Sequence, residues 1–344
     1  MRKYIAFPMF CIALASMVSV TAQARLDRSC RKEIVSMCGI KRNAMRSCIQ
    51  EKQEQLSDSC KTQLREQIKA RTGRKQTEKN ATTGNAENGE ILSYGADDLQ
   101  KLRFYRATEK DAPLIIFVHG GGWKRGDMDN ATGTHKTSHF LSQGFAFASI
   151  NYRLVPESTV EDQAADIASA TAVLQDKAKI LGIDPDRIFM MGHSAGAHLV
   201  ALTTTDLSYF RKAGADPAAL RGVILLDGAA YDVPSQLVTG NRIMQSTYKQ
   251  TFGTELQRQK SLSPTYHTAA PNAPAFMILH IDRKDAKQQS EKLAKSLLEN
   301  GTSAEVQAIP GKGMTGHRDI NQNLGKTDYP ATAIVDSWLA AQLR

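Results

Sequence analysis

Two glycine-rich motifs, each placed directly after an apolar run, constrain the fold of this chain more than any other feature. HGGGW at residues 119–123 follows the apolar run 113–118, and GHSAG at residues 192–196 follows the run 187–191. Short, continuous apolar runs of this kind are typical of buried parallel strands. Small, helix-forming residues come after Ser194, so this serine is predicted to occupy the sharp strand-to-helix turn of a Gly-x-Ser-x-Gly motif.

The two motifs answer two needs of one reaction, the attack of a serine on an acyl carbonyl. Ser194 would supply the nucleophile. The backbone N–H groups of Gly121, Gly122 and Ala195 would stabilise the negative charge that develops on the carbonyl oxygen. Backbone donors need no particular side chain, so we interpret the flanking His119 and Trp123 as packing residues that shape the loop.

The rest of the chain beyond residue 90 alternates between apolar runs and amphipathic stretches. This alternation predicts the α/β class with a doubly wound, mostly parallel sheet. Further strands are expected at residues 145–150, 223–226, 276–280 and 304–309, and helices at 161–181, 285–299 and 328–343. The polar segment 231–267 breaks the alternation, which leaves two possibilities: a cap over the site or a long surface loop.

Residues 90–344 resemble the α/β-hydrolase fold, and within it the HGGG-type carboxylesterases and the feruloyl-esterase-like and kynurenine-formamidase-like enzymes. Besides the two glycine motifs, the resemblance rests on NYRL at 151–154, followed by Pro156, and on MGHSAGAHL at 191–199. It implies a serine hydrolase that cleaves a small-molecule carboxylic ester through an acyl-enzyme, with no metal and no organic cofactor.

A serine hydroxyl needs a base to accept its proton, and the fold places that base after the acid and after the last strand. Three histidines lie far enough downstream of Ser194: His267, His280 and His317. His267 falls in the segment of the possible cap, and His280 ends a strand before any suitable acid. His317, in the glycine-rich loop expected at residues 311–316 after the last strand, is therefore the predicted base.

The acid that orients the base has two candidates after the strand 276–280. Related esterases carry an Asp seven residues before a Gln-Ser pair, and counting back from Gln289 gives Asp282. Counting forward from His280 instead favours Asp285, which also suits the N-cap of the next helix. We predict Asp282. A third carboxylate, Asp227, also ends an expected strand and is interpreted as a loop cap or as a residue that supports the site from behind.

The N-terminal segment has the pattern of a cleaved secretory signal. A basic start is followed by the apolar run 4–20, and the small residues of AQA at 22–24 match a signal-peptidase site. A retained membrane anchor is the alternative, since the run is at the lower edge of the length that spans a bilayer. We predict a signal peptide at residues 1–24 and an exported protein, periplasmic or secreted.

Four cysteines lie in residues 25–70, and the segment 90–344 has none. An even number in an exported chain predicts two disulfides rather than a metal site, because no Cys-x-x-Cys spacing is present. Four cysteines allow three pairings. Helical patterning predicts a small helical hairpin, which favours the nested pairing, Cys38 with Cys48 and Cys30 with Cys60. The spacing is similar to that of the cysteine-rich repeats in a Golgi glycoprotein, a resemblance that implies no function.

Charge is concentrated at the N-terminus. Residues 1–80 contain 17 Lys and Arg against 7 Asp and Glu, whereas the remaining residues contain 27 against 28. The basic module 25–70 could make weak contact with an anionic surface. Sequence-specific nucleic-acid binding is not expected, and the absence of aromatic residues from 25–80 removes a stacking platform for single strands. The polar segment 71–89 is predicted to be a flexible linker before the catalytic domain 90–344.

Two other functions stay open. An aryl-formamidase would use the same residues on an amide. A non-catalytic binding domain of hydrolase fold is disfavoured because both Ser194 and His317 are present.

Overall fold

The structure is a computed structural model that describes residues 27–38, 48, 52, 55–63, 89–240 and 244–344. The predicted signal peptide and all but Gly89 of the predicted linker lie outside the described residues. The chain divides into two compact units, Met1–Gly84 and Asn85–Arg344, which are taken separately below.

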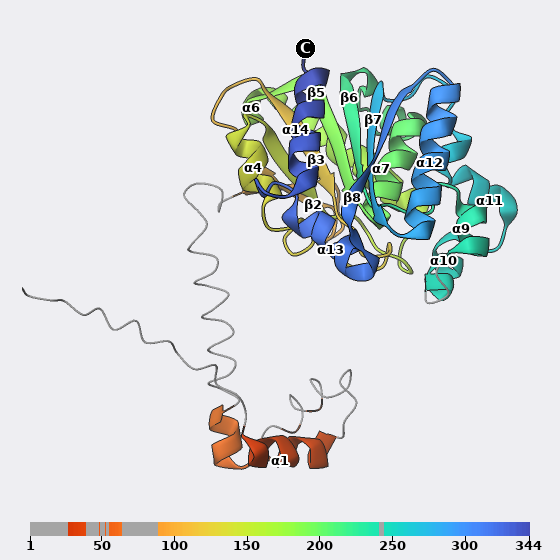
Figure 1. The fold of residues 1–344 in the computed structure, drawn as a ribbon. Coiled ribbons are helices and arrows are strands. Elements are labelled where there is room, and N and C mark those ends of the chain that lie inside the picture. The colour runs from red at the N-terminus through yellow and green to blue at the C-terminus, as the bar shows by residue number, and fades with distance from the viewer. Residues whose placement is uncertain (1–26, 39–47, 49–51, 53–54, 64–88, 241–243) are drawn as a thin grey trace, which may run out of the picture. The chain divides into compact units, whose positions relative to one another are not determined.

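The larger unit is built on an eight-stranded sheet with the order β1-β2-β4-β3-β5-β6-β7-β8 (Figure 1). The pairs β1–β2 and β2–β4 are antiparallel and all other pairs are parallel, which confirms the predicted α/β class. The strands are β1 (Glu90–Ser93), β2 (Lys101–Tyr105), β3 (Ala112–Val118), β4 (Ala146–Ile150), β5 (Ile183–His193), β6 (Leu220–Leu226), β7 (Ala275–Asp282) and β8 (Ser303–Lys312).

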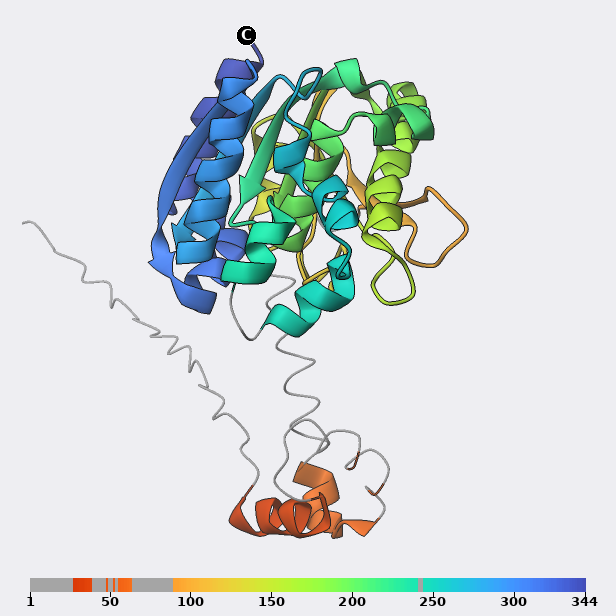
Figure 2. The same cartoon turned by 90° about the vertical axis from the view of Figure 1, so that its right-hand side faces the viewer.

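Helices cover both faces of this sheet (Figures 1 and 2). Helices α5, α7 and α12 contribute to the apolar core on one face, and α4 and α14 to the core on the other. The helices of this unit are α4 (Lys136–Ser142), α5 (Val160–Asp176), α6 (Ala178–Leu181), α7 (Ala195–Thr205), α8 (Ser208–Ala213), α9 (Val233–Thr239), α10 (Gln245–Phe252), α11 (Leu256–Ser261), α12 (Lys284–Glu299), α13 (Gly313–Asn323) and α14 (Pro330–Gln342), with short 3₁₀ turns at Pro217–Ala219 and Pro264–Tyr266.

The central strand β3 is buried on both of its faces. Ile116 and Val118 pack into one core, whereas Ile115 and Phe117 pack into the other, and all four side chains are fully buried. Each such side chain contributes about 1.5 to 3 kcal/mol through burial. Because β3 pairs in parallel with β5, the ends of both strands meet at one edge of the sheet, with Val118 opposite Gly192. The two glycine motifs therefore lie side by side.

Two segments differ from the expected elements. The predicted helix 161–181 is divided into α5 and α6 at Lys177, whose backbone (φ −91°, ψ 6°) is not helical. Helix α5 begins with a capping box in which Thr159 and Asp162 each accept a backbone N–H from the other. The glycine-rich stretch before His317 is not a loop, because its first part ends β8 and its second part begins α13.

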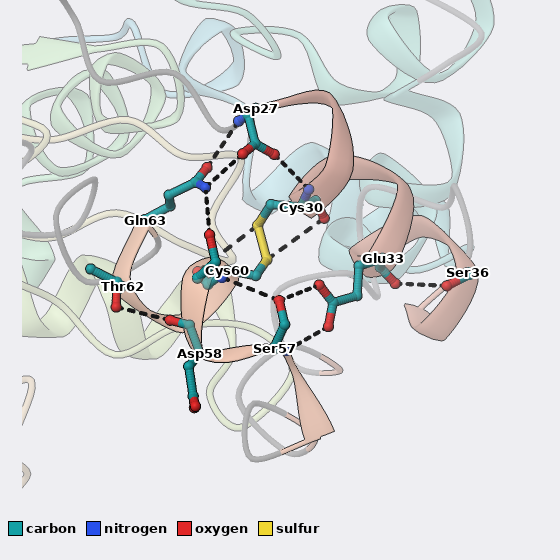
Figure 3. Close-up of a disulfide and its surroundings, with 10 residues drawn as sticks. Asp27, Cys30, Glu33, Ser36, Ser57, Asp58, Cys60, Thr62 and Gln63 are labelled. Carbon is teal, nitrogen blue, oxygen red and sulfur yellow. Dashed lines mark hydrogen bonds between the residues drawn. A yellow bond between two sulfur atoms is a disulfide. The ribbon is translucent and has the colours of Figure 1, made fainter.

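The smaller unit contains α1 (Arg28–Cys38) and a second helical stretch at residues 58–63. One disulfide joins Cys30 to Cys60 (Figure 3) and a second joins Cys38 to Cys48, which confirms the predicted nested pairing. Ile34 and Leu56 pack against the first disulfide.

Polar contacts add to this small core. The carboxylate of Glu33 accepts hydrogen bonds from the backbone N–H and the hydroxyl of Ser57, and Gln63 donates to Asp27. Among the described residues, no helix is long and apolar enough to cross a membrane.

Candidate active site

Ser194 stands on a strained turn between β5 and α7. Its backbone has φ 56° and ψ −119°, a conformation that L-residues rarely adopt and that persists only where the surroundings enforce it. Its N–H donates to the carbonyl of Leu226 at 3.0 Å, which ties the turn to the neighbouring strand. A Cβ on Gly192 would lie 2.4 Å from the Gly196 carbonyl oxygen, so the turn can close only with glycine there. These features match the turn that the sequence predicts.

His317 lies within hydrogen-bonding distance of Ser194. Its Nε2 is 3.0 Å from the Ser194 Oγ, although 123 residues separate the two in sequence. Its Nδ1 is 2.6 Å from the Oδ2 of Asp227. A carboxylate oxygen is an acceptor, so Nδ1 carries the proton and Nε2 is left to accept the serine proton. His317, the fifth residue of α13, therefore lies where a base for Ser194 would have to lie.

Asp227 follows directly after β6 and is held in place by hydrogen bonds to the backbone of β7. Its side chain is fully buried, and its backbone has φ 43°. Its Oδ1 accepts the N–H of Ile281 at 3.1 Å, and its own N–H donates to the carbonyl of Leu279 at 2.7 Å. Because β6 lies between β5 and β7, a carboxylate at its end reaches the histidine beside Ser194.

The prediction that Asp282 orients His317 is wrong. The Asp282 side chain is 74% exposed, and its Oδ2 lies 3.7 Å from the Lys312 ammonium. The pairing of β7 with β8 is irregular between His280 and Asp282, and beyond this irregularity Asp282 stands opposite Lys312. The carboxylate is therefore aligned with the edge strand β8 and contacts solvent and a lysine.

The alternative acid, Asp285, does not contact His317 either. It lies in the first turn of α12, where its carboxylate is 3.7 Å from the Arg283 Nε and accepts a hydrogen bond from Gln236 at 3.4 Å. It is also not the N-cap of that helix, because Arg283 occupies the N-cap position. The sequence did hold a signal for Asp227, a carboxylate directly after four apolar residues at the end of an inner strand. The structure places Asp227 in direct contact with His317, whereas its position in the sequence suggested a loop cap or a residue that supports the site from behind.

The HGGGW loop lines the space in front of Ser194. Gly121 has φ 135° and Gly122 has φ 62°, and both line the pocket together with Ala195. Ala195 is the first residue of α7, where backbone N–H groups have no partner within the helix. Among the described residues, the N–H groups of Gly121 and Gly122 form no hydrogen bond.

Trp123 links this loop to the rest of the site. Its indole N–H donates to the Nδ1 of His198 at 3.2 Å, so the other ring nitrogen of His198 carries the proton that it donates to the Leu262 carbonyl. Burial lowers the pKa of His198 to about 4, which keeps this ring neutral at neutral pH. His119 stacks on Tyr152 with ring centroids 4.4 Å apart, and burial lowers the pKa of His119 to about 4.

Buried polar residues also hold α13 and His317 in place. The fully buried Lys136 donates to the Thr132 carbonyl and to both the backbone and the side-chain oxygen of Asn321, and burial lowers its pKa. His193, next to Ser194, packs its ring 4.6 Å from the ring of His317 and donates from Nε2 to the His317 carbonyl at 2.9 Å. Burial lowers the pKa of His193, so its ring is neutral as well.

These residues surround a pocket of about 640 Å³. Met244 and Tyr248, from the segment 231–267, form part of its wall, so this segment behaves as a cap rather than as a surface loop. The pocket wall carries charges of both signs. The cationic side chains are Arg125, Arg283 and Arg318, and the anionic ones are Asp127 and Asp285. In the described part of the chain, no group of three or more His, Cys, Asp or Glu side chains could hold a metal ion.

Comparison with known proteins assigns the chain to a family. The BD-FAE family profile matches residues 102–297. Curated relatives include a probable isoprenylcysteine alpha-carbonyl methylesterase of Oryza sativa subsp. japonica, 25% identical over 64% of this chain and 55% of the relative. Another is the kynurenine formamidase of Salmo salar, 25% identical over 71% of this chain and 79% of the relative. The chain thus spans about half of the rice protein.

Solved structures of esterases share the fold. Esterase B from Lactobacillus rhamnosis superposes with a TM-score of 0.61 at 20% identity, over 79% of this chain and 92% of the esterase. Butyrate-bound Est2 from Thermogutta terrifontis gives a TM-score of 0.60 at 22% identity, over 74% and 95%. With the family profile covering more than half of the residues, the chain belongs to the BD-FAE family and has the α/β-hydrolase fold of these esterases.

Proposed function

We propose that this protein is a serine esterase that cleaves small carboxylic esters with Ser194, His317 and Asp227. The observation that carries the proposal is the continuous contact from the Ser194 Oγ through both ring nitrogens of His317 to the buried Asp227 carboxylate, at the wall of a pocket. A nucleophile within reach of a base, and a base oriented by an acid, is the arrangement that activates a serine hydroxyl.

The reaction follows from these contacts in two halves. His317 Nε2 takes the Ser194 proton while Oγ attacks the ester carbonyl, and the N–H groups of Gly121, Gly122 and Ala195 stabilise the oxyanion. The tetrahedral intermediate then breaks its bond to the alkoxide, which takes the proton of the imidazolium and leaves as an alcohol, while the acyl group stays on Ser194. In the second half, a water gives a proton to His317 and attacks the acyl group. Collapse releases the carboxylic acid, and the proton returns to Ser194.

Covalent labelling tests this proposal directly. A fluorophosphonate probe should label the parent protein, and Ser194→Ala should abolish labelling. The same change should reduce the kcat on p-nitrophenyl acetate by about 10⁶-fold. His267→Gln, a change in the cap away from this contact chain, is the matched control and should keep both activities. Labelling or turnover by Ser194→Ala at the parent level would refute the mechanism.

A formamidase is the second candidate, favoured by the similarity to the salmon enzyme over 71% of this chain. The same three residues would attack a formamide, and the amine would leave with the proton of His317. Parallel assays on p-nitrophenyl acetate and on N-formylkynurenine separate the two candidates. A higher kcat/KM on the formamide would replace the esterase proposal, whereas a panel of acetyl and feruloyl esters would define the acyl preference.

We also infer that the protein is exported, with a signal peptide at residues 1–24. Two disulfides in the smaller unit fit an oxidising compartment, because they are rare in the cytosol. The mature chain should begin at Arg25, and reduction should raise its intact mass by four hydrogens. The basic module would make at most a weak, salt-sensitive contact with an anionic surface. A cell fraction in which the full-length chain stays in the cytoplasm would contradict export.

A further inference from the structure

The two oxygens of the Asp227 carboxylate have different surroundings. Oδ1 accepts the backbone N–H of Ile281 at 3.1 Å. Oδ2 faces two cationic or potentially cationic groups, the Nδ1 of His317 at 2.6 Å and the Nε of Arg283 at 3.4 Å. The guanidinium and the imidazole therefore meet at a single oxygen atom. Any positive charge on one of them is felt by the other at short range.

Arg283 is held at this position by the backbone and by a second carboxylate. It follows β7 as the N-cap residue of α12, and its N–H donates to the Ile281 carbonyl at 2.7 Å. Its side chain is 15% exposed and lines the pocket. The Nε is buried without a hydrogen bond in the described part of the chain, and the Oδ1 of Asp285 lies 3.7 Å from it.

A mostly buried guanidinium whose Nε has no hydrogen bond is costly unless neighbouring charges compensate for its lost hydration. Here Asp227 and Asp285 compensate for it jointly. The same placement has a consequence for His317. As Ser194 gives up its proton, His317 becomes an imidazolium that needs Asp227 as its counter-charge. Arg283 already neutralises part of the negative charge of that carboxylate, and its own positive charge repels a second cation beside it.

We propose that Arg283 is a positioning residue that acts through Asp227 to keep His317 in its basic form at mildly acidic pH, and so sets the acidic limit of activity. This inference rests on the proposed role of Ser194, His317 and Asp227. Arg283 does not touch the reacting atoms. Its charge lowers the tendency of the free enzyme to take up a proton on His317, which would otherwise block the base.

Other charged or titratable groups face this assembly from each surrounding element. His193, the last residue of β5, contacts His317, and the buried Lys136 of α4 donates to Asn321 of α13. The remaining groups are Asp285 beside Arg283, Arg318 and Asp319 after His317 in α13, Arg125 and Asp127 in the glycine loop, and the buried hydroxyl groups of Tyr231 and Tyr329. Arg283 differs from all of them by its contact with the oxygen that holds His317.

The pH profile of kcat/KM on a neutral ester tests the proposal. Arg283→Gln removes the charge and should move the acid limb to higher pH by about one unit. Arg283→Lys keeps the charge and should stay close to the parent profile. Asp285→Asn removes the carboxylate that partly neutralises Arg283, so it should move the limb in the opposite direction, to lower pH. A purely structural role for Arg283 would lower kcat in both Arg283 variants and leave the limb where it is.

A second measurement separates this inference from the esterase proposal. In a Ser194→Ala background, NMR titration of the His317 ring should show its midpoint rising with Arg283→Gln and falling with Asp285→Asn, whatever the substrate is. Should Arg283→Gln fail to fold, the Asp285→Asn shift still decides. Unmoved midpoints and unmoved acid limbs would overturn the role of Arg283. Missing esterase activity with shifted midpoints would overturn the proposed function and keep the coupling.

Discussion

The Nδ1 of His317 lies 2.6 Å from the Oδ2 of Asp227, a residue 90 positions earlier in the chain. The contact is made across the strand ends, because Asp227 follows β6 and His317 follows β8, with β7 between them in the sheet. Arg283, which comes directly after β7, lies against the same carboxylate oxygen. A cation thus occupies the place after β7 in which the sequence suggested an acid.

The first prediction separates the two carboxylates. Asp227→Asn should reduce the kcat by about 10⁴-fold, because the amide no longer fixes the tautomer of His317 or stabilises its imidazolium. Asp282→Asn is the matched control. Its exposed pair with Lys312 contributes little, so this variant should retain the parent kcat and stability. Steady-state kinetics with thermal unfolding of both variants is the measurement. An inactive Asp282 variant beside an active Asp227 variant would reverse the assignment.

A second prediction concerns two adjacent glycines of the HGGGW loop. A Cβ on Gly121 would lie 1.8 Å from the Arg125 carbonyl oxygen, whereas one on Gly122 would meet nothing closer than the Met244 methyl at 3.6 Å. Gly121→Ala should therefore destabilise the fold by about 3 kcal/mol or more and abolish activity. Gly122→Ala should cost about 1 to 2 kcal/mol for its left-handed backbone and keep measurable turnover. Denaturant unfolding would show whether the two variants differ in this order.

The third prediction is a loss of stability at mildly acidic pH. Burial lowers the pKa of both His119 and His198 from 6.5 to about 4 in the folded state. Between these values the unfolded chain binds more protons, so stability is complete above pH 6.5 and falls as the pH drops toward 4. Each group can contribute about 3 kcal/mol to this loss.

The test of the pH dependence is the free energy of unfolding measured from pH 8 to pH 4. His198→Gln, which keeps an acceptor for the Trp123 indole, should reduce the slope by up to one proton in this window. A slope that is the same in the parent and in the variant would contradict a neutral, buried His198. A stability that increases toward pH 4 would contradict the sign of both shifts.

The fourth prediction concerns the two nested disulfides. The Cys30–Cys60 bond closes a separation of 30 residues and packs against Ile34 and Leu56, whereas Cys38–Cys48 closes 10 residues. Replacing the outer pair, Cys30 and Cys60, by serines should lower the free energy of unfolding of the smaller unit by about 4 kcal/mol through chain entropy. Replacing the inner pair, Cys38 and Cys48, should lower it by about 3 kcal/mol. Limited proteolysis of residues 25–70 should be faster in the outer-pair variant. Equal resistance of both variants would contradict this order.

Much of the fold could be predicted because its signals are local. The runs that became β3 and β5 are apolar over their whole length, and Ser194 lies between two glycines that only a tight turn requires. The helical hairpin expected from the sequence favoured the nested one of three possible pairings, and the disulfides have that pairing. In each case the deciding interactions lie within a few residues, or within one small unit, so the sequence pattern contains them.

The choice of acid depended on tertiary structure. Asp227 and Asp282 each stand at the end of an apolar strand and look alike in sequence, yet one side chain is fully buried and the other is 74% exposed. The difference arises from strand order, which places β6 next to the strand of Ser194, and from the irregular pairing of β7 with β8 after His280. Neither the order of parallel strands nor a register shift can be predicted from the local residue pattern, because both are set by packing between segments far apart in the chain.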